Sequence, residues 1–360
     1  MGHPGNKPAK ETKHNLPKYT CLVAVRLKDI ARELGVSTVT VSKVLRGNPD
    51  ISEATRARVL QRMRELNYQP NLLARGLASG KTYTMGLVVP DLVQPFFAEF
   101  AKSLSEVLRE TGRALLIASS EDNPSIEQAE IRALLSRGVD TLLLASCQLE
   151  LKRIYPVRDE RTPYMLIDRN YPALEAPFVG SNDFLTGLVA TRHLIDTGRR
   201  KIAHITSRAL SPSTERQRGY RAALQSAEIA VDEKLIVSLE HIDESGDREG
   251  YAAMQQLLAK HPEIDAVFCY NDLAAIGAMD AARDAGHSIP GDIAFVGCGN
   301  MRYARYLRTP LTSIDHGTDR LGQQAARMAV ALSEKQSLPE TTILLEPTLV
   351  VRESSATPPR

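Results

Sequence analysis

The chain of 360 residues has no tryptophan, few other aromatic residues and no long apolar run. Its longest apolar stretches, such as 85–90 and 141–145, are far shorter than the roughly 18 residues that a membrane-spanning helix needs. Residues 1–20 are polar and contain several prolines, which argues against a secretory signal. The sequence therefore predicts a cytoplasmic globular protein with no membrane partner.

Cysteine is also scarce, since Cys21, Cys147, Cys269 and Cys298 are the only four and have no CxxC spacing. We expect reduced, mostly buried thiols and no metal site. The sequence has no Walker loop, HExxH or GxSxG, and the glycines at 297 and 299 lack the third glycine of a dinucleotide loop. These absences argue against an enzyme, and no cofactor is expected.

The net charge of +2 is unevenly distributed. Residues 1–80 contain 14 Lys and Arg against 6 Asp and Glu, whereas residues 81–360 contain 31 against 37. A basic head on an acidic body indicates that the head binds a polyanion such as nucleic acid.

The pattern of the head predicts three short helices between residues 27 and 67, after an extension over 1–24. Leu27, Ile30, Ala31 and Leu34 follow the helical i, i+3, i+4, i+7 spacing. A glycine at 35 then provides a turn, and serines at 37 and 52 can cap the next two helices. This is the layout of a helix-turn-helix.

The second helix is expected to present its polar face to base edges in a DNA major groove. Its hydroxyls can hydrogen-bond to bases, its valine can contact a thymine methyl, and its lysine can reach guanine or phosphate. The candidate base-contacting residues are Thr38, Val39, Thr40, Ser42 and Lys43. Arg46, Arg56 and Arg58 are candidates for phosphate contacts.

The rest of the chain is of the α/β class. Beyond residue 82, short Val/Ile/Leu runs alternate with amphipathic helical segments as far as about residue 297. Such βα units predict parallel sheets with helices on both faces. About 270 residues are too many for one small sheet, so two similar lobes with a cleft between them are expected.

Polar and aromatic side chains follow several of the predicted strands, where ligands bind in such sheets. They combine carboxylates and amides, suited to hydroxyl groups, with aromatic faces. The candidates are Asp91, Phe96, Phe97, Asp168, Asn271, Asp272 and Asn300, with Arg169 beside them. One of the two phenylalanines is expected in the core and the other in the cleft.

Several motifs together resemble the LacI/GalR family of transcription regulators, over nearly all of 27–353. They are LKDIA and GVSTVTVSKVL in the head, LNYQPN after it, VPDLVQPFFA at 89–98, RQRGY at 216–220, NDLAAIG at 271–277 and TPLTSI at 309–314. The resemblance implies a helix-turn-helix domain over 25–69, a hinge helix and linker over 70–82, and a two-lobe body resembling periplasmic binding proteins over 83–353, with 354–360 as a tail.

The resemblance also implies roles for particular residues. The hinge helix, 71–79 here, would enter the minor groove with Leu77 wedged between base pairs, so Asn71 and Leu77 join the DNA-binding candidates. Arg216 joins the effector-binding candidates. We draw the N-lobe at about 83–181 and 311–341, and the C-lobe at about 182–308 and 342–353.

The sequence departs from the family pattern at the proposed cleft. Gly299 stands where relatives often carry an aspartate, Gln94 stands where they carry an asparagine, and tryptophan is absent. These differences leave open a sugar acid, a modified or phosphorylated sugar, or a purine-like effector in place of a standard hexose.

We therefore expect a homodimeric repressor that binds a palindromic operator and is switched by a small effector, a sugar or sugar derivative, between its lobes. Two alternatives remain: a purine-type regulator that needs a co-repressor, and an activator. A transport binding protein is disfavoured, because it would need a signal peptide and no helix-turn-helix.

Overall fold

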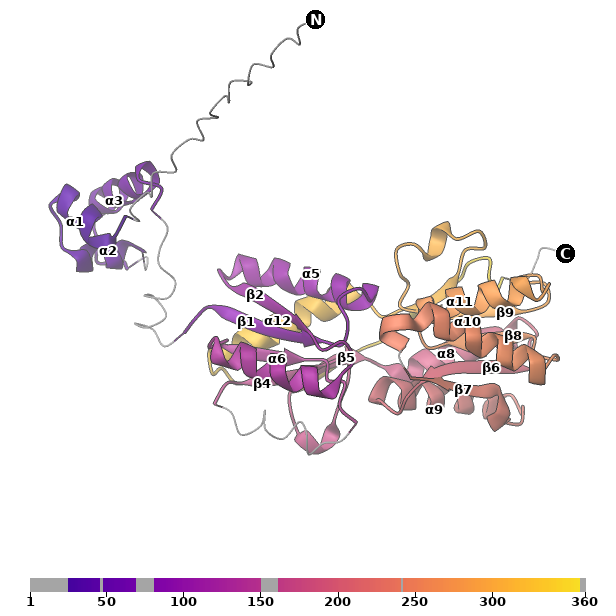
Figure 1. Cartoon of the computed structure of the whole chain (residues 1–360). Helices are drawn as coiled ribbons and strands as arrows, with labels where there is room; N and C mark the ends of the chain where they lie inside the picture. The colour runs from indigo at the N-terminus through magenta and orange to yellow at the C-terminus, as the bar shows by residue number, and fades with distance from the viewer. Residues whose placement is uncertain (1–24, 46–47, 69–80, 150–160, 241, 357–360) are drawn as a thin grey trace, which may run out of the picture. The chain divides into compact units, whose positions relative to one another are not determined.

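The computed structural model describes residues 25–45, 48–68, 81–149, 161–240 and 242–356. The chain divides into two compact units, Met1–Arg75 and Gly76–Arg360. Figure 1 shows the elements of both.

The first unit contains the three predicted helices, α1 (Leu27–Leu34), α2 (Thr38–Leu45) and α3 (Glu53–Glu65). Gly35 ends α1 in the left-handed conformation, at φ 66°, which glycine adopts without a Cβ penalty. Their small core consists of Ile30, Ala31, Val41, Val44, Val59 and Met63.

The second unit contains two six-stranded sheets, one in each lobe. The N-lobe sheet is wholly parallel, with the order β11 (Thr342–Leu345), β5 (Phe178–Ser181), β4 (Tyr164–Ile167), β3 (Thr141–Leu144), β1 (Thr84–Val89) and β2 (Ala114–Ser119). The C-lobe sheet has the order β12 (Thr348–Val350), β10 (Thr312–Asp315), β9 (Ala294–Cys298), β8 (Ala266–Cys269), β6 (Ile202–Ser207) and β7 (Ile236–Leu239). Only β12 pairs antiparallel in it.

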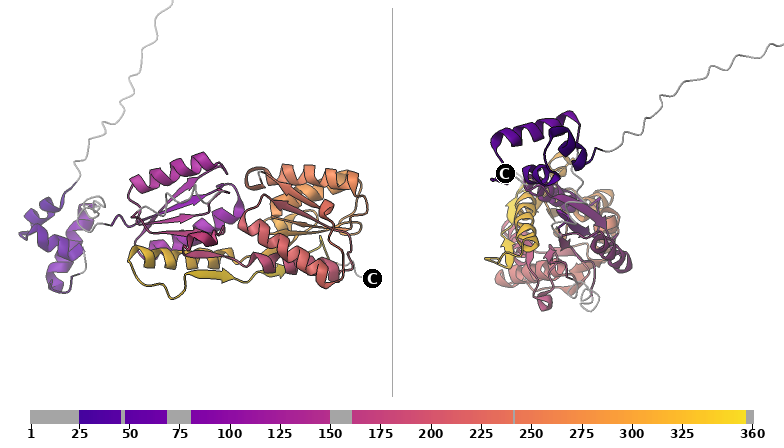
Figure 2. Two further views of the ribbon diagram at one scale, coloured as in Figure 1. Left: turned by 90° about the horizontal axis from the view of Figure 1, so that it is seen from below. Right: turned by 90° about the vertical axis from the view of Figure 1, so that its left-hand side faces the viewer.

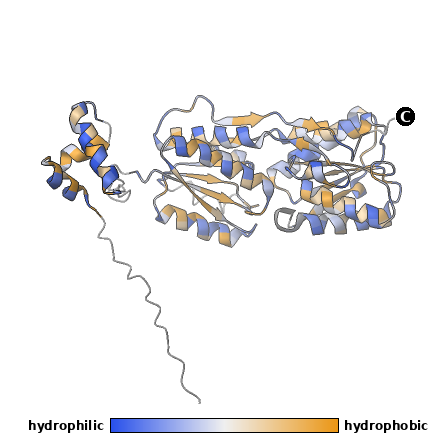
Figure 3. Ribbon diagram, turned by 90° about the horizontal axis from the view of Figure 1, so that it is seen from above, coloured by the Kyte–Doolittle hydropathy of each residue, from blue (hydrophilic) through white to orange (hydrophobic). Residues whose placement is uncertain are grey.

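Helices cover both faces of each sheet, as expected for alternating βα units. Figure 2 shows helices above and below the strands of both lobes, and Figure 3 shows apolar strands between helices of mixed hydropathy. The helices are α5 (Pro95–Glu110), α6 (Pro124–Ser136), α8 (Asp183–Asp196), α9 (Ser211–Ser226), α10 (Ile242–Lys260, kinked at Ser245), α11 (Asp272–Asp284) and α12 (Thr318–Ser333). Short 3₁₀ turns occur at Pro172–Leu174, Glu233–Leu235 and Ala304–Tyr306.

Among the described residues of the second unit, four apolar clusters fill the space between sheets and helices. In the N-lobe, one cluster lies against α5 and α12 and another against α6. In the C-lobe, one lies against α10 and α11 and another against α8 and α9. Three of the four cysteines, Cys147, Cys269 and Cys298, are buried free thiols, and Cys21 lies outside the described residues.

The predicted lobe bounds are wrong at two strands. β10 pairs with β9, so Thr312–Asp315 belongs to the C-lobe sheet and not to the N-lobe. β11 pairs with β5, so Thr342–Leu345 belongs to the N-lobe sheet and not to the C-lobe. A strand of four residues carries no signal for the sheet it joins, which is why these crossings were misplaced. The chain passes between the lobes after β5, after β10 and between β11 and β12.

Candidate functional site

In the helix-turn-helix, α2 begins at a side-chain cap. The Oγ atom of Ser37 accepts a hydrogen bond from the backbone N–H of Thr40 at 3.0 Å. Val41 and Val44 face the core, so the other side of α2 is left for contact with DNA.

The predicted base-contacting residues of α2 differ in how much of each side chain is exposed to solvent. Thr38 and Val39 are exposed, and 58% of Val39 is accessible. Thr40, Ser42 and Lys43 are half-buried, and the Nζ atom of Lys43 lies 2.5 Å from the Oδ2 atom of Asp50. Arg46, Asn71 and Leu77 lie outside the described residues.

The two described phosphate candidates contact carbonyl groups of the head. Nη2 of Arg56 donates to the carbonyl of Asn48 at 2.8 Å, and Nη2 of Arg58 donates to the carbonyl of Leu34 at 3.1 Å. These bonds tie α3 to the loop before it and to the end of α1.

A pocket lies at the strand ends of the second unit, between the lobes. It is lined by residues of both lobes. Six predicted residues line it: Phe96, Phe97, Asp168, Arg216, Asn271 and Asp272. Its other lining residues are Gln94, Pro95, Glu99, Tyr270, Leu273, Cys298, Gly299, Met301 and His316.

The two phenylalanines differ in burial, although both line the pocket, whereas only one was expected there. Phe97 is 3% exposed and belongs to the core cluster against α5 and α12, whereas Phe96 is only partly buried. The Phe96 ring makes an edge-on contact with the His316 ring, with centroids 6.1 Å apart. Phe96 is therefore the more exposed of the two phenylalanines in this pocket.

Arg216 is buried and has several partners within the protein. Its Nε atom donates to Oδ1 of Asp183 at 2.8 Å, and its Nη1 atom donates to the carbonyl of Tyr270 at 2.8 Å. The guanidinium carbon also lies 4.5 Å from the centroid of the Tyr270 ring. These contacts fix the guanidinium at the pocket wall.

Close packing of two helices brings Arg216 to Asp183. A Cβ atom at Gly187 in α8 would lie 1.9 Å from the carbonyl oxygen of Arg216, and one at Gly219 in α9 would lie 2.1 Å from that of Phe184. Only glycine allows the two backbones to approach so closely.

Asp272 and Asn271 line the pocket, and both side chains accept hydrogen bonds from other groups of the protein. Asp272 accepts from Ser313 Oγ and from the Met301 N–H, both at 2.6 Å, and burial raises its pKa to about 6. Asn271 caps α11 by accepting from the Ala274 N–H at 2.8 Å.

Asp91 and Asn300 are not among the lining residues. The carboxylate of Asp91 accepts from the Val93 N–H at 2.6 Å, within its own loop. Asn300 donates to Asp315 at 2.9 Å and accepts from Arg352 at 2.6 Å.

His316 lines the pocket and is not among the residues that the sequence predicts. Its Nδ1 atom is 2.9 Å from Ser181 Oγ, and its Nε2 atom is 3.1 Å from Cys298 Sγ and 3.4 Å from Nη2 of Arg216. Burial, together with the nearby Arg216 charge, holds its pKa well below the ordinary value. It follows β10, a strand the sequence did not indicate, whereas Tyr270 directly follows a predicted strand and could have been found.

Among the described residues, no group of three or more His, Cys, Asp or Glu side chains is placed to hold a metal ion. Across the same residues, no helix is long and apolar enough to cross a membrane.

Comparisons with known proteins agree with both units. Residues 26–71 match the family described as bacterial regulatory proteins, lacI family, and residues 191–355 match a periplasmic binding protein-like domain. The HTH-type transcriptional regulator GalR of Salmonella typhimurium strain LT2 is 37% identical over 333 residues, covering 92% of this chain and 96% of the relative. The HTH-type transcriptional repressor PurR of Histophilus somni strain 129Pt is 31% identical over 334 residues, covering 92% and 99%.

Solved structures share the fold. A transcriptional regulator CelR–cellobiose complex is 31% identical, with a TM-score of 0.69 and coverage of 92% of this chain and 99% of that one. A lac repressor dimer bound to operator and the anti-inducer ONPF covers the same shares with a TM-score of 0.79, at 23% identity, which supports the fold alone. The relatives are regulators and not enzymes, and the chain belongs to the LacI family of DNA-binding transcriptional regulators.

Proposed function

We propose that this protein is a repressor whose affinity for a palindromic operator is switched by a small effector bound in the pocket between its lobes. The observation that carries the proposal is that the pocket is lined from both lobes. Phe96 and Asp168 come from the N-lobe, whereas Arg216 and Asn271 come from the C-lobe. A ligand that contacts both lobes binds one relative orientation better than others, and only such a difference in affinity can shift a conformational equilibrium.

The effector we propose is a sugar or a sugar derivative. The Asp168 carboxylate and the Arg216 guanidinium can form hydrogen bonds with adjacent hydroxyl groups, and Phe96 supplies an apolar face. The CelR complex with cellobiose is a relative that supports this class of ligand.

A second candidate is a purine-like co-repressor, which the PurR relatives at 31% identity favour. The two candidates make opposite predictions. An inducing sugar lowers the affinity for operator DNA, whereas a co-repressor raises it.

On the DNA side, we propose that α2 enters the major groove in the cytoplasm. Thr38, Val39, Thr40, Ser42 and Lys43 would read bases. Arg46 would contact phosphate, and Asn71 and Leu77 would act in the minor groove. A homodimer would present two such heads to the two half-sites.

The test has two steps. A thermal-unfolding screen with pentoses, hexoses, disaccharides, sugar acids, sugar phosphates and purines identifies compounds that raise the melting temperature by mass action. Each hit is then tested for its effect on binding to an operator selected from random duplex DNA. An Asp168→Asn variant, matched with Asp280→Asn on the exposed face of α11, is expected to lose the effect of the ligand while the control keeps it. No change in DNA affinity with any hit would contradict the switch.

A further inference from the structure

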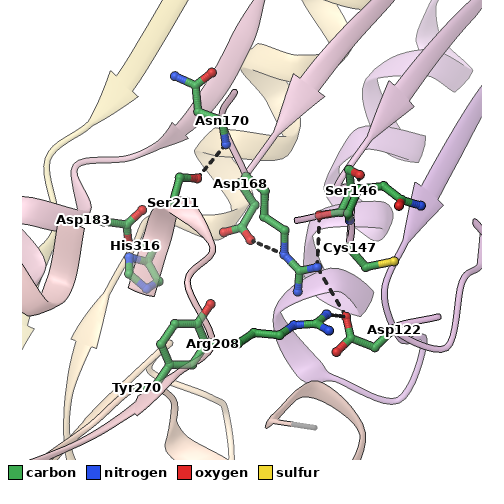
Figure 4. A network of polar contacts seen from close by, with 12 residues as sticks. Asp122, Ser146, Cys147, Asp168, Asn170, Asp183, Arg208, Ser211, Tyr270 and His316 are labelled. Atoms are coloured by element: carbon green, nitrogen blue, oxygen red, sulfur yellow. Dashed lines mark hydrogen bonds and ion pairs between the residues drawn. The ribbon is translucent and has the colours of Figure 1, made fainter. Parts of the chain in front are cut away.

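An ion pair joins the two lobes beside the effector pocket. Asp122 follows β2 of the N-lobe and Arg208 follows β6 of the C-lobe. The Nη2 atom of Arg208 donates to the Oδ1 atom of Asp122, as Figure 4 shows. Neither residue lines the pocket, so the contact is separate from the proposed effector-binding residues.

This pair is shielded from solvent, because only 2% of the Asp122 side chain and 16% of the Arg208 side chain are exposed. Screening by salt is therefore weak, in contrast to surface ion pairs. Since the partners belong to different lobes, the bond exists only in lobe orientations close to this one.

A second arginine, Arg169, can pair with Asp122 when Arg208 moves away, so the buried carboxylate keeps a positively charged partner. Nη1 of Arg169 lies 3.6 Å from the same Oδ1 atom of Asp122 and donates to the Ser146 carbonyl at 3.2 Å. Arg169 belongs to the N-lobe, so it stays with Asp122 when the C-lobe moves away. Arg208, the more exposed partner, would then be hydrated.

The segment that holds Arg169 also contacts the pocket and the other lobe. Asp168, directly before it, lines the pocket. Asn170, directly after it, donates its backbone N–H to Oγ of Ser211 in the C-lobe at 2.7 Å. Three consecutive residues therefore connect the effector site, the interlobe ion pair and a second interlobe hydrogen bond (Figure 4).

We propose that Asp122 and Arg208 form an interlobe latch, which holds the lobes in the pocket-forming orientation even without effector. They are positioning residues, since they act on the effector through the lobe orientation and not by contact. This inference deepens the proposed function and rests on it for the link to the effector. The latch itself is a property of the free protein: the larger the fraction held in this orientation, the higher the apparent affinity for any ligand that needs it.

The experiment measures the distance between the lobes in the full chain without effector or DNA. Spin labels are attached through Glu110→Cys in α5 and Gln225→Cys in α9, both exposed, in a Cys21→Ser background. Cys147, Cys269 and Cys298 are buried. Pulsed dipolar spectroscopy then compares the parent with Arg208→Gln, Asp122→Asn and the double variant.

Loss of one charge-assisted hydrogen bond is expected to lower the ratio of this orientation to more open ones by roughly tenfold or more. The distance distribution should therefore broaden or shift in both single variants. The double variant should match the singles, because the two side chains act through one bond. Arg208→Lys, which keeps the charge, should restore much of the parental distribution.

Arg218→Gln is the matched control. Its Nη1 atom pairs with Glu215 at 2.7 Å within α9, on the surface of one lobe. This variant should leave the distances unchanged. Parental distance distributions in Arg208→Gln and Asp122→Asn, with both proteins folded by circular dichroism, would overturn the latch.

If either single variant fails to fold, the double variant still decides the question, because the latch predicts a broadened or shifted distance distribution for it and a parental distribution would overturn the latch. Failure of the latch is distinguishable from failure of the proposed function, because this measurement needs no effector. A latch that opens in these variants while no ligand alters DNA binding would refute the function alone.

Discussion

At the scale of single residues, Arg216 is at once a pocket residue and one half of a buried ion pair. Its resemblance to the family motif suggested an effector-binding arginine. The structure adds Asp183, which is 8% exposed and bonded to the Arg216 Nε atom. Removing the guanidinium therefore has a structural cost that is separate from any loss of ligand binding.

Arg216→Ala is expected to lower the free energy of unfolding by roughly 3–5 kcal/mol, because Asp183 is left as an unpaired buried carboxylate. The double variant with Asp183→Asn removes both charges and should regain most of that loss. Denaturant unfolding of the parent, single and double variants measures the coupling. If the double variant is stable yet does not respond to the effector, Arg216 binds ligand; equal stability of parent and single variant would contradict the ion-pair argument.

Two buried side chains, Asp272 and His204, make the free energy of unfolding depend on pH in opposite directions. Burial raises the pKa of Asp272 to about 6, so the stability that this shift contributes is present below about pH 4 and lost as the pH rises through 6. Burial lowers the pKa of His204 to about 4, so its contribution is lost as the pH falls from 6.5 toward 4. Across pH 4–6 the two partly offset each other.

Asp272→Asn should therefore make the free energy of unfolding rise more steeply between pH 4 and 6 than it does in the parent. The difference accumulated over that range is about 3 kcal/mol for a shift of about two pKa units. Denaturant titrations at several pH values give the slope, with Asp280→Asn on the same helix as the exposed control. Parallel curves for parent and Asp272→Asn would show that the carboxyl is not shifted.

At the scale of elements, the pairing of α8 with α9 positions the C-lobe side of the pocket. Gly187 and Gly219 let the helices touch backbone to backbone, which places Arg216 on α9 beside Asp183 at the start of α8. A methyl group at either glycine must push the helices apart.

Gly187→Ala is accordingly expected to cost about 3 kcal/mol or more and to weaken effector binding. Gly198→Ala is the informative comparison, because Gly198 has φ 93° and no atom within 4 Å of an added Cβ. That control should cost only about 1–2 kcal/mol of backbone strain and leave binding unchanged. A Gly187 variant no worse than the Gly198 variant would show that the contact can relax.

The elements with a clear apolar period could be predicted, and those without one could not. β4 at Tyr164–Ile167 is an uninterrupted apolar run in the sequence, and the three helices of the head follow from their spacing and caps. β5 (FVGS) and β10 (TSID) are as short as β4 (YMLI), but glycine or polar residues interrupt their apolar runs, so the sequence shows no recognisable strand pattern there.

The pocket residues that the sequence predicts are likewise those that follow an uninterrupted apolar run. Asp168 and Asn271 follow strands visible in the sequence and do line the pocket, whereas His316 follows β10 and was missed. Asp91 also follows a predicted strand, but its carboxylate is used by a local turn, which sequence order cannot reveal.

At the scale of the whole molecule, the edge strands of the N-lobe sheet are candidates for the contact between two copies of the chain. β2 forms one edge of this sheet. Leu116 is 37% exposed and Ile117 is 43% exposed. Because successive residues of a strand point to opposite faces of the sheet, apolar surface is exposed on both faces of β2. An exposed apolar edge strand invites association with another chain. The homodimer predicted from a two-fold operator would bury this edge.

Ile117→Lys is therefore expected to convert a dimer into a folded monomer, because each copy would bring an unpaired charge into the shared surface. Leu344→Lys is the matched control: Leu344 lies on β11, the opposite edge of the same sheet, and is 51% exposed. Sedimentation velocity at micromolar concentration should give a dimer for the parent and the control and a monomer for Ile117→Lys.

Because a monomer occupies one half-site at a time, its affinity for a palindromic site should fall steeply while weak binding to a single half-site persists. A monomeric parent, or a dimer that survives Ile117→Lys but not Leu344→Lys, would move the interface away from β2.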